Sequence, residues 1–255
     1  MATFDNLSAV VTGGASGIGA TIASSLMKAG ARVAVLDIAF GEYAPAGALA
    51  IEADIRNSEA VRAAIETAAS AHGGIDIVIN NAGVGAQGSI EDATDEEWAR
   101  VLDINVVGMA RVARAALPYL RCSEHAAIVN VGSIAATVGL EQRAVYSASK
   151  GAVVALTRAM AVDHLKDGIR VNCVSPGTAN TPWIGRLLAN AADPAAELRQ
   201  LQERQPHGRL VEMDEIAEAV LYLASPFATS TTGVCLAVDG GMDSLRPRKV
   251  TVAGN

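Results

Sequence analysis

Short apolar runs alternate along most of the chain with stretches whose apolar residues recur every three or four positions. The short runs predict strands, and the periodic stretches predict amphipathic helices. The predicted strands are residues 7–12, 32–37, 48–51, 75–80, 126–131, 169–174 and 233–238. The predicted helices are residues 17–29, 58–71, 95–120, 145–165 and 214–224, with Thr94 as the N-cap of the third.

Most of these strands are apolar along nearly their whole length, a pattern typical of parallel strands that are buried on both faces. Right-handed connections then predict a single doubly wound, Rossmann-type α/β domain, with a parallel seven-stranded sheet and helices on both faces. We expect this domain to cover residues 1–245, followed by a C-terminal tail at 246–255. Residues 176–213 form the one long stretch that we expect to be irregular, and such loops are usually functional lids.

The composition narrows the class of protein. The chain has 255 residues, of which 51% are hydrophobic and only 4% aromatic, so an aliphatic core of one large domain is expected. The net charge is −7 without a basic stripe, which argues against nucleic acid or a membrane surface as a partner. No apolar run reaches the ~18 residues of a membrane span, and residues 1–8 do not resemble a signal peptide.

Cysteine and histidine usage adds two expectations. The three cysteines are far apart and lack the CxxC spacing, so they indicate free thiols in a reducing compartment and hence a cytoplasmic protein. The four histidines show no metal-ligand spacing, and no metal is expected.

A glycine-rich turn, TGGASGIG at residues 12–19, follows the first strand and opens the first helix. Its key glycines, Gly13, Gly17 and Gly19, have the spacing GxxxGxG instead of the commoner GxGxxG. Glycine permits a tight turn and close approach of the backbone, and the helix N-terminus offers free N–H groups to a pyrophosphate. The position of the turn therefore favours a dinucleotide site over a merely structural turn.

Asp37 ends the second predicted strand, about 20 residues beyond these glycines, where dinucleotide-binding folds use an acidic residue. A carboxylate there accepts hydrogen bonds from both ribose hydroxyls and repels a 2′-phosphate. No arginine directly follows Asp37, so NAD is favoured over NADP. The alternative is that Asp37 only caps a turn at the strand end.

Tyr146 and Lys150 lie four residues apart in a predicted helix and therefore share one of its faces. A nearby ammonium favours the ionised form of a phenol. A tyrosine in this setting can exchange a proton with an alcohol or carbonyl oxygen. Taken alone, the pair fits a solvated helix face equally well.

Together these features resemble the short-chain dehydrogenase/reductase family, from about residue 7 to residue 241. Several spaced motifs carry the resemblance, in the order of the family. They are the glycine turn, Asp54 with Ile55, the run Asn80-Asn81-Ala82-Gly83, Asn105, Ser133, Tyr146 with Lys150, and Pro176-Gly177 with Thr181.

The resemblance implies a role for each matching residue. It implies a catalytic group of Asn105, Ser133, Tyr146 and Lys150. It implies cofactor contacts from Gly13, Ser16, Gly17, Ile18, Gly19, Asp37, Asp54, Ile55, Asn80, Ala82, Gly83, Tyr146, Lys150, Pro176, Gly177, Ala179 and Thr181. Ala179 departs from the family, which more often has a larger branched residue at that position.

Asn105 is a poor helix former inside a predicted helix. Its side chain either bonds the backbone locally or accompanies a bend whose freed carbonyl carries a water toward Lys150.

Three arginines are candidates for binding a substrate. Arginine forks suit carboxylates, and a lid folded over Tyr146 would bring Arg143, Arg186 and Arg204 together. The alternative is three solvated surface side chains. Trp183 either lines the same pocket, in which Ser133 holds the substrate oxygen, or packs within the lid.

The lid and the C-terminal segment resemble a branch with 3-hydroxybutyrate-type and 2-keto-3-deoxy-L-fuconate dehydrogenases. The resemblance implies oxidation of a secondary alcohol on a small hydroxy or keto acid that is sugar-derived, and it implies a homotetramer. An acyl-thioester (acyl-carrier-protein) ketoreductase is the alternative enzyme, and Asp37 argues against it because such reductases usually take NADPH. A non-catalytic dinucleotide-sensing protein is the alternative of another class.

Overall fold

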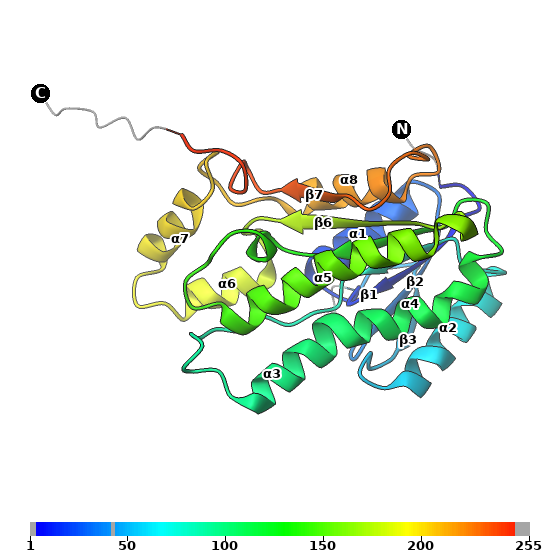
Figure 1. Cartoon of the computed structure of the whole chain (residues 1–255), viewed down its shortest axis with the longest axis horizontal. Coiled ribbons are helices and arrows are strands. Elements are labelled where there is room, and N and C mark those ends of the chain that lie inside the picture. The colour runs from blue at the N-terminus through cyan, green and yellow to red at the C-terminus, as the bar shows by residue number, and fades with distance from the viewer. Residues whose placement is uncertain (1–3, 42–43, 248–255) are drawn as a thin grey trace, which may run out of the picture.

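A computed structural model describes residues 4–41 and 44–247 of the chain. Within them, seven strands form one parallel sheet in the order β3-β2-β1-β4-β5-β6-β7 (Figure 1). The strands are β1 (Ser8–Thr12), β2 (Arg32–Asp37), β3 (Leu49–Glu52), β4 (Ile77–Asn80), β5 (Ala127–Val131), β6 (Arg170–Pro176) and β7 (Cys235–Val238). The chain reverses its direction of winding between β1 and β4, and in such sheets ligands bind outside the carboxyl ends of the strands at this point.

Helices cover both faces of the sheet. The α-helices are α1 (Gly17–Lys28), α2 (Ser58–His72), α3 (Asp95–Leu102), α4 (Met109–Leu120), α5 (Ala144–Asp163), α6 (Pro182–Ala189), α7 (Pro194–Glu203) and α8 (Met213–Ala224). Three short turns are the π-helix η1 (Asp103–Gly108) and the 3₁₀ helices η2 (Ile134–Ala136) and η3 (Leu165–Asp167). In Figure 1, α2, α4 and α5 lie in front of the sheet and α1 and α8 behind it.

Two apolar clusters fill the space between these layers. One packs α1 and α8 against the sheet, with Ile22, Leu26 and Ile216 fully buried. The other packs α2, α4 and α5 against the opposite face, with Ile65 and Leu120 fully buried. The doubly wound α/β fold that the sequence predicted is therefore confirmed.

The predicted long helix at 95–120 is not continuous. It consists of α3, the π-turn η1 and α4, because six residues from Asp103 to Gly108 take the wider π-helical spacing. π-bulges bend helices and occur frequently at functional sites. Asn105 lies inside this turn. Of the two alternatives for Asn105, the π-turn supports the bent helix. The helix predicted at 95–120 was continuous and did not include this break.

The prediction that residues 176–213 are irregular is wrong, because this segment contains α6 and α7. Both helices begin with a proline, at Pro182 and Pro194, which suits the first turn of a helix. Thr181 and Asp193 precede them as N-caps, and each side chain accepts a backbone N–H. The sequence contains these start signals. The two helices are nevertheless too short to show a clear apolar period, and the prediction of an irregular segment followed from that.

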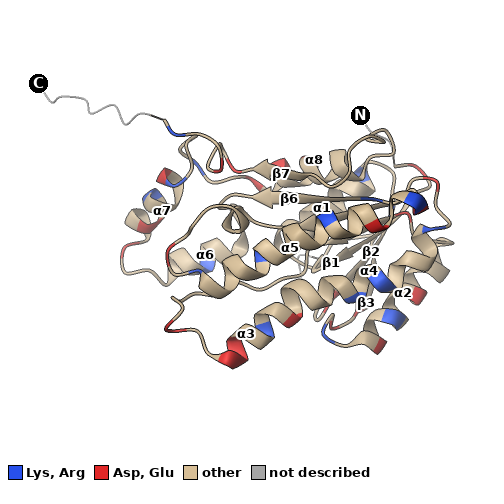
Figure 2. Cartoon of the chain, viewed as in Figure 1, with Lys and Arg blue, Asp and Glu red and all other residues tan. Residues whose placement is uncertain are grey.

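Figure 1 places α6 and α7 beyond the carboxyl ends of the strands, where the arrowheads of β6 and β7 point. Figure 2 shows acidic and basic residues interspersed along the outer helices, in keeping with the modest net charge of −7. None of the helices in the described residues is long and apolar enough to cross a membrane. Of the predicted tail at 246–255, only residues 246 and 247 fall within the described part.

Candidate active site

The glycine-rich turn between β1 and α1 forms one wall of the site. Gly13 and Gly17 have φ angles of +62° and +54°, in the left-handed region that favours glycine. A Cβ on Gly13 would lie 2.8 Å from the Cα of Ala82, and a Cβ on Gly19 would overlap the carbonyl oxygen of Gly13. At Gly17 the nearest atom to a Cβ would be Pro182 Cδ, at 4.0 Å. The turn is thus tightly packed against the loop after β4 and open toward the start of α6.

The N-terminus of α1 is free of competing groups. Ser16 is its N-cap, is exposed and makes no side-chain capping bond, and Ile18 in the first turn is half-buried. The first turn of α1 carries no acidic residue. Unsatisfied N–H groups and the helix dipole both attract anions at such a position. The start of α1 therefore fits a diphosphate.

Asp37 turns back from the end of β2 toward the glycine turn. Its Oδ2 accepts a hydrogen bond from Ala15 N at 3.0 Å, and its Oδ1 accepts one from Ile38 N at 2.8 Å. The side chain is only half-buried, and each carboxylate oxygen has a second lone pair. Asp37 therefore caps the strand end and still presents acceptor capacity beside the turn, so the two roles considered for it are compatible.

Asp54 and Ile55 follow β3 at the edge of the site. Arg56 forms a two-point ion pair with Asp54, with a shortest distance of 2.6 Å, and this hydrogen bonding lowers the pKa of the Asp54 carboxyl. Ile55 is buried, and a Cβ on Gly108 would lie 2.7 Å from its Cδ1. The absence of a side chain at Gly108 lets η1 approach this edge closely.

Asn80 differs from the expectation that it faces the cofactor. Its side chain is 1% exposed and donates from Nδ2 to Asn130 Oδ1 at 2.9 Å, inside the sheet. The next residue, Asn81, faces the site instead and donates from Nδ2 to the carbonyl oxygens of Thr12 and Gly13, both at 3.0 Å. Thr12 Oγ1 in turn accepts from Ala82 N at 3.1 Å.

Asn81 lies within the run Asn80-Asn81-Ala82-Gly83 that carries the family resemblance, whereas Thr12 is a residue of the site wall that the sequence interpretation did not name. Successive side chains at a strand end point to opposite sides. Two adjacent asparagines do not by themselves reveal which one faces the glycine turn.

Lys150 and Tyr146 lie side by side near the end of β5, and Ser133 follows the same strand. Ser133 is 9% exposed and its Oγ accepts from Ala135 N at 3.1 Å. Lys150 is 5% exposed, its Nζ donates to Val131 O at 2.9 Å, and it lies 5.8 Å from the centre of the Tyr146 ring. The ammonium is therefore held beside the phenol, at the carboxyl edge of the sheet. This geometry excludes a solvated helix face for Lys150.

Asn105 links η1 to the loop after β4 and to α5. Its Oδ1 accepts from Val84 N at 2.8 Å, while its Nδ2 donates to Val84 O at 2.9 Å and to Ser149 Oγ at 3.0 Å. Ser149 Oγ donates to Tyr146 O at 2.7 Å. A Cβ on Gly83 would lie 3.1 Å from Asn105 Oδ1 and 3.7 Å from the Lys150 ammonium. The side-chain hydrogen bonds of Asn105 therefore join it to other segments of the chain and not to its own helix.

The segment after β6 connects the sheet to the lid. Pro176 ends β6 and Gly177 follows it. Ala179 is 8% exposed and forms a parallel bridge with Val211 at the far end of the lid. Thr181 then caps α6.

The start of α6 lies beside the glycine turn and the loop after β4. Pro182 Cδ is the atom nearest to the open side of Gly17, and the ring of Trp183 lies 3.9 Å from where a Cβ on Gly85 would be. Trp183 keeps 47% of its surface exposed, so it covers the loop after β4 without being packed into the lid core. The lid core consists of Ile184, Leu201 and Leu210.

Two of the three candidate arginines come together. Arg143 immediately precedes α5 and is half-buried; burial lowers the pKa of its guanidinium, and the nearby charge of Arg204 lowers it further. The charges of Tyr146 and of Glu197 on α7 instead raise the pKa of Arg143. Arg186 is exposed on α6, and no interaction within the described residues joins it to the other two. The charges of Arg143 and Arg204 therefore interact, whereas the part of Arg186 in an anion site stays a prediction.

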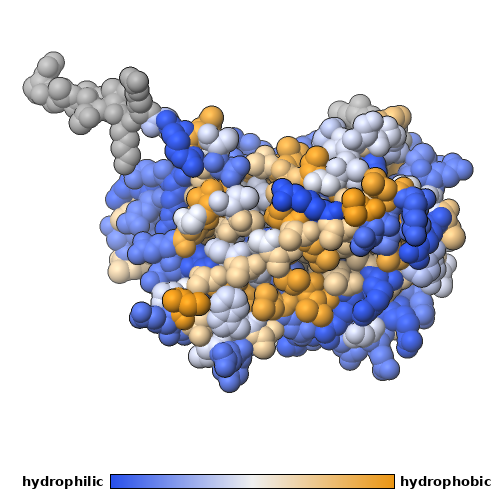
Figure 3. Space-filling view, in the orientation of Figure 1, coloured by the Kyte–Doolittle hydropathy of each residue, from blue (hydrophilic) through white to orange (hydrophobic). Residues whose placement is uncertain are grey.

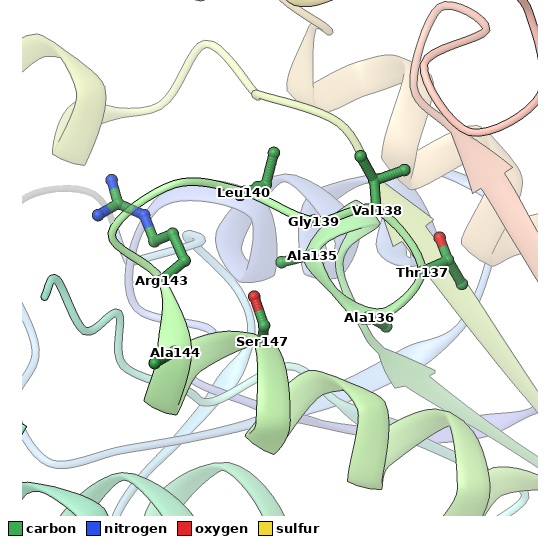
Figure 4. Close-up of a pocket in the computed structure, with 9 residues that line it drawn as sticks. All are labelled: Ala135, Ala136, Thr137, Val138, Gly139, Leu140, Arg143, Ala144 and Ser147. Carbon is green, nitrogen blue, oxygen red and sulfur yellow. The ribbon is translucent and has the colours of Figure 1, made fainter. Parts of the chain in front are cut away.

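A cavity of about 360 Å³ lies between η2 with the loop that follows it and the start of α5 (Figure 4). Its lining comes from residues 135–140 together with Arg143, Ala144 and Ser147. Ser133 and Tyr146 are not part of the lining, although each lies within two residues of it. The cavity therefore lies next to the candidate catalytic group, and Arg143 is the charged residue in its lining. No cluster of three or more metal-ligating side chains occurs in the described residues.

Comparison with known proteins gives a consistent result. A family model described as enoyl-(acyl carrier protein) reductase matches residues 13–243. The chain is 39% identical to 2-(S)-hydroxypropyl-CoM dehydrogenase 3 of Xanthobacter autotrophicus, over 92% of this chain and 96% of that protein. It is 37% identical to 2-keto-3-deoxy-L-fuconate dehydrogenase of Xanthomonas campestris pv. campestris, over 91% of this chain and 78% of that protein.

Among solved structures, the fold matches the ligand-free aldohexose dehydrogenase of Thermoplasma acidophilum. The TM-score is 0.90 at 32% identity, over 97% of this chain and 98% of that one. Sequence and structure thus agree over nearly the whole length of the chain. The protein belongs to the short-chain dehydrogenase/reductase family, whose members include dehydrogenases that act on CH–OH groups.

Proposed function

We propose that this oxidoreductase uses NAD to oxidise a secondary alcohol on a small hydroxy or keto acid, or to reduce the corresponding ketone. The observation that carries the proposal is the position of the Lys150 ammonium, which is buried, bonded to Val131 O and 5.8 Å from the Tyr146 ring. This pair lies at the carboxyl edge of the sheet, on the same side as the glycine turn.

The residues around the turn fit a nicotinamide dinucleotide. The open side of Gly17 and the unoccupied donors at the start of α1 suit a pyrophosphate. Asp37 suits the adenosine ribose, and its charge disfavours a 2′-phosphate. By family resemblance, Asp54 and Ile55 flank the adenine, Asn80 to Gly83 line the ribose side, and residues 176–181 hold the carboxamide. Within that run, Asn81 is the asparagine that faces the glycine turn. These features favour NAD over NADP.

When bound, the nicotinamide supplies or accepts the hydride. In the oxidation direction, the phenolate of Tyr146 removes the hydroxyl proton of the substrate. The adjacent Lys150 ammonium stabilises the phenolate, and Ser133 Oγ, at the end of β5, holds the substrate oxygen. Asn105 acts by position, since it fixes Val84 and Ser149 and thereby the backbone beside Tyr146.

Arg143 and Arg204 support an acidic substrate. The charge of Arg204 helps to lower the pKa of the Arg143 guanidinium, and an anion bound between the two side chains would relieve their repulsion. Arg186, exposed on α6, joins them only if the lid moves. The named substrates of the relatives include a deoxy sugar acid, which favours a sugar-derived hydroxy or keto acid.

The runner-up enzyme is a ketoreductase of acyl thioesters on an acyl carrier protein. The description of the matching family model keeps this candidate open, whereas Asp37 and the named dehydrogenase relatives favour the hydroxy acid. The two readings differ in cofactor, because an acyl-thioester reductase would be expected to prefer NADPH.

The proposal extends to a homotetramer in the cytoplasm. In relatives the long helices that correspond to 95–120 and 145–165 pair across a dimer, and the last strand joins dimers. Figure 3 shows apolar side chains along this face, and Val107, Val162 and Leu165 are 43%, 67% and 58% exposed. The free and exposed thiol of Cys122 fits a reducing compartment.

The test is NAD and NADP reduction with a panel of hydroxy acids, sugar acids, neutral sugars and simple alcohols. We expect NAD-dependent turnover of a sugar-derived acid and much weaker turnover of its neutral analogue. Equal activity on uncharged alcohols would contradict the acidic substrate, and a preference for NADP would contradict the role of Asp37. Sedimentation analysis of the same preparation tests the tetramer.

A further inference from the structure

Gln205 lies two residues after the end of α7, and its side-chain amide is buried. It is 1% exposed, although its neighbours Arg204 and His207 are exposed. Burying an amide carries a cost unless it is hydrogen-bonded, so the bonds of Gln205 indicate what its position stabilises.

The Gln205 amide joins both ends of the lid. Its Nε2 donates to Thr178 O at 3.3 Å, in the segment after β6, and to Arg209 O at 2.5 Å, in the segment that leads to α8. Thr178 O also accepts from Val211 N at 3.0 Å. Both lone pairs of the Thr178 carbonyl are therefore used, and this peptide unit is held from two directions.

The acceptor of the same amide packs against Gly177. Gln205 Oε1 is buried and has no hydrogen-bond partner among the described residues. A Cβ on Gly177 would overlap this oxygen and would lie 3.0 Å from Asp239 Cα. The φ of Gly177 is not in the left-handed region, so close approach and not backbone conformation is what requires a glycine here.

We infer that Gln205 is a positioning residue for the nicotinamide seat: through Thr178 and Gly177 it sets the backbone of residues 177–179. The inference rests on the proposed function, in which residues 176–181 hold the carboxamide. Gln205 does not contact the glycine turn or Asp37, which serve the adenosine half. Its loss should therefore affect the nicotinamide half of the cofactor selectively.

The test compares two ligands on one variant. Gln205→Met keeps the length of the side chain and removes both donors, and Gln200→Met, on the exposed side of α7, is the matched control. Binding of NADH and of ADP-ribose, which lacks the nicotinamide, is measured by calorimetry. We expect the Kd of NADH to rise about tenfold in Gln205→Met, the loss of about one net hydrogen bond, with the Kd of ADP-ribose unchanged. Gln200→Met should change neither.

The outcomes separate this inference from the proposed function. Unchanged NADH binding by Gln205→Met, or equal weakening of NADH and ADP-ribose, overturns the inference, because the second result indicates a general structural defect. Failure of the unsubstituted protein to bind NADH overturns the proposed function instead.

A double-substitution cycle gives a second test that does not depend on one variant. Gly177→Ala places a methyl group where Gln205 Oε1 lies, so it should weaken NADH binding strongly. Gln205→Ala vacates that space, and the added effect of Gly177→Ala should then be several-fold smaller, with the contact to Asp239 Cα remaining. An equal effect of Gly177→Ala in both backgrounds would show that the two residues are not coupled and would overturn the inference.

Discussion

The glycine turn with its wall lies next to the start of the lid at 176–213, but the two regions are held in different ways. Around the turn, buried backbone groups are bonded directly, as in the bonds of Asn81 to Thr12 O and Gly13 O. In the lid, two short helices rest on a small apolar cluster and on the Gln205 amide, and Arg186 and Arg204 are exposed.

We infer from this difference that the residues around the turn serve the reaction, whereas the exposed side chains of the lid serve substrate selectivity. Asn81 and Asn105 each make two or more side-chain hydrogen bonds, and the buried Lys150 donates to Val131 O, so we expect the geometry of this part of the site to tolerate little change. The side chains of the lid that meet the solvent tolerate substitution with little effect on the fold, which lets one scaffold accept different substrates. We therefore expect substitutions in the two regions to have effects of different kind.

The largest effect is expected at the catalytic group. Tyr146→Phe removes the proton donor and acceptor and should lower kcat by about 10²–10⁴-fold, the range of general acid–base catalysis. The hydroxyl is the only group removed, so the Kd of NADH should change little. Steady-state kinetics with NADH titration by fluorescence measures both. Turnover near that of the unsubstituted protein would contradict the mechanism.

A pair of glycine substitutions compares the two regions directly. Gly19→Ala should destabilise the fold by about 1–3 kcal/mol and weaken NADH binding, because the new Cβ overlaps Gly13 O. Gly185→Ala in α6 meets no atom within 4 Å and should be neutral or stabilise by about 0.4–1 kcal/mol.

Thermal unfolding with and without NADH measures both variants. If Gly185→Ala lowers the thermal stability as much as Gly19→Ala does, the proposed difference between the two regions is wrong.

The arginines test selectivity. Arg143→Ala should raise the KM of an acidic substrate about tenfold, as expected for a charged hydrogen bond of about 1.5–3 kcal/mol, and should leave NADH binding unchanged. Arg186→Ala should have a smaller effect, since Arg186 is apart from the other two.

The control is a neutral analogue of the substrate, whose KM should be indifferent to both substitutions. An effect of Arg186→Ala larger than that of Arg143→Ala would indicate that the lid closes further on the substrate.

The smallest effect is expected at the junction of the lid and α8. Hydrogen bonding to Arg209 lowers the pKa of Glu215 to about 2, and the Glu215 carboxylate also accepts from Glu212 N at 2.8 Å. Because the folded-state pKa lies below the unfolded value of about 4.3, this stabilisation is present above about pH 4.3 and is lost as the pH falls toward 2.

Both side chains of this pair are substantially exposed, so solvent screening limits its contribution to about 1 kcal/mol or less. Glu215→Gln should therefore lower the free energy of unfolding by that amount at pH 7 and by little near pH 2, as measured in urea. A stability difference that stays constant with pH would contradict the assignment.

The sequence predicted most of the fold and most residues of the candidate site. Apolar runs, glycines and the spacing of Tyr146 and Lys150 are local patterns. The structure confirms the sheet, places Lys150 beside Tyr146 and links Asn105 to Tyr146 through Ser149. The errors fall where local signals were weak or ambiguous. The lid helices were too short for a clear period, and of two adjacent asparagines the sequence did not show that Asn81 faces the site.

The amino-acid sequence by itself determined the alternation of strands and helices, the tight turn at Gly13 and Gly19 and the candidate acid–base pair, because each depends on neighbouring residues and on hydrophobic period. Only the tertiary structure decided the environment of these groups. It places Lys150 Nζ on Val131 O, joins Asn105 to Val84, and brings Arg143 near Arg204 while leaving Arg186 apart. Such contacts depend on the packing of segments distant in the chain, which no local pattern encodes.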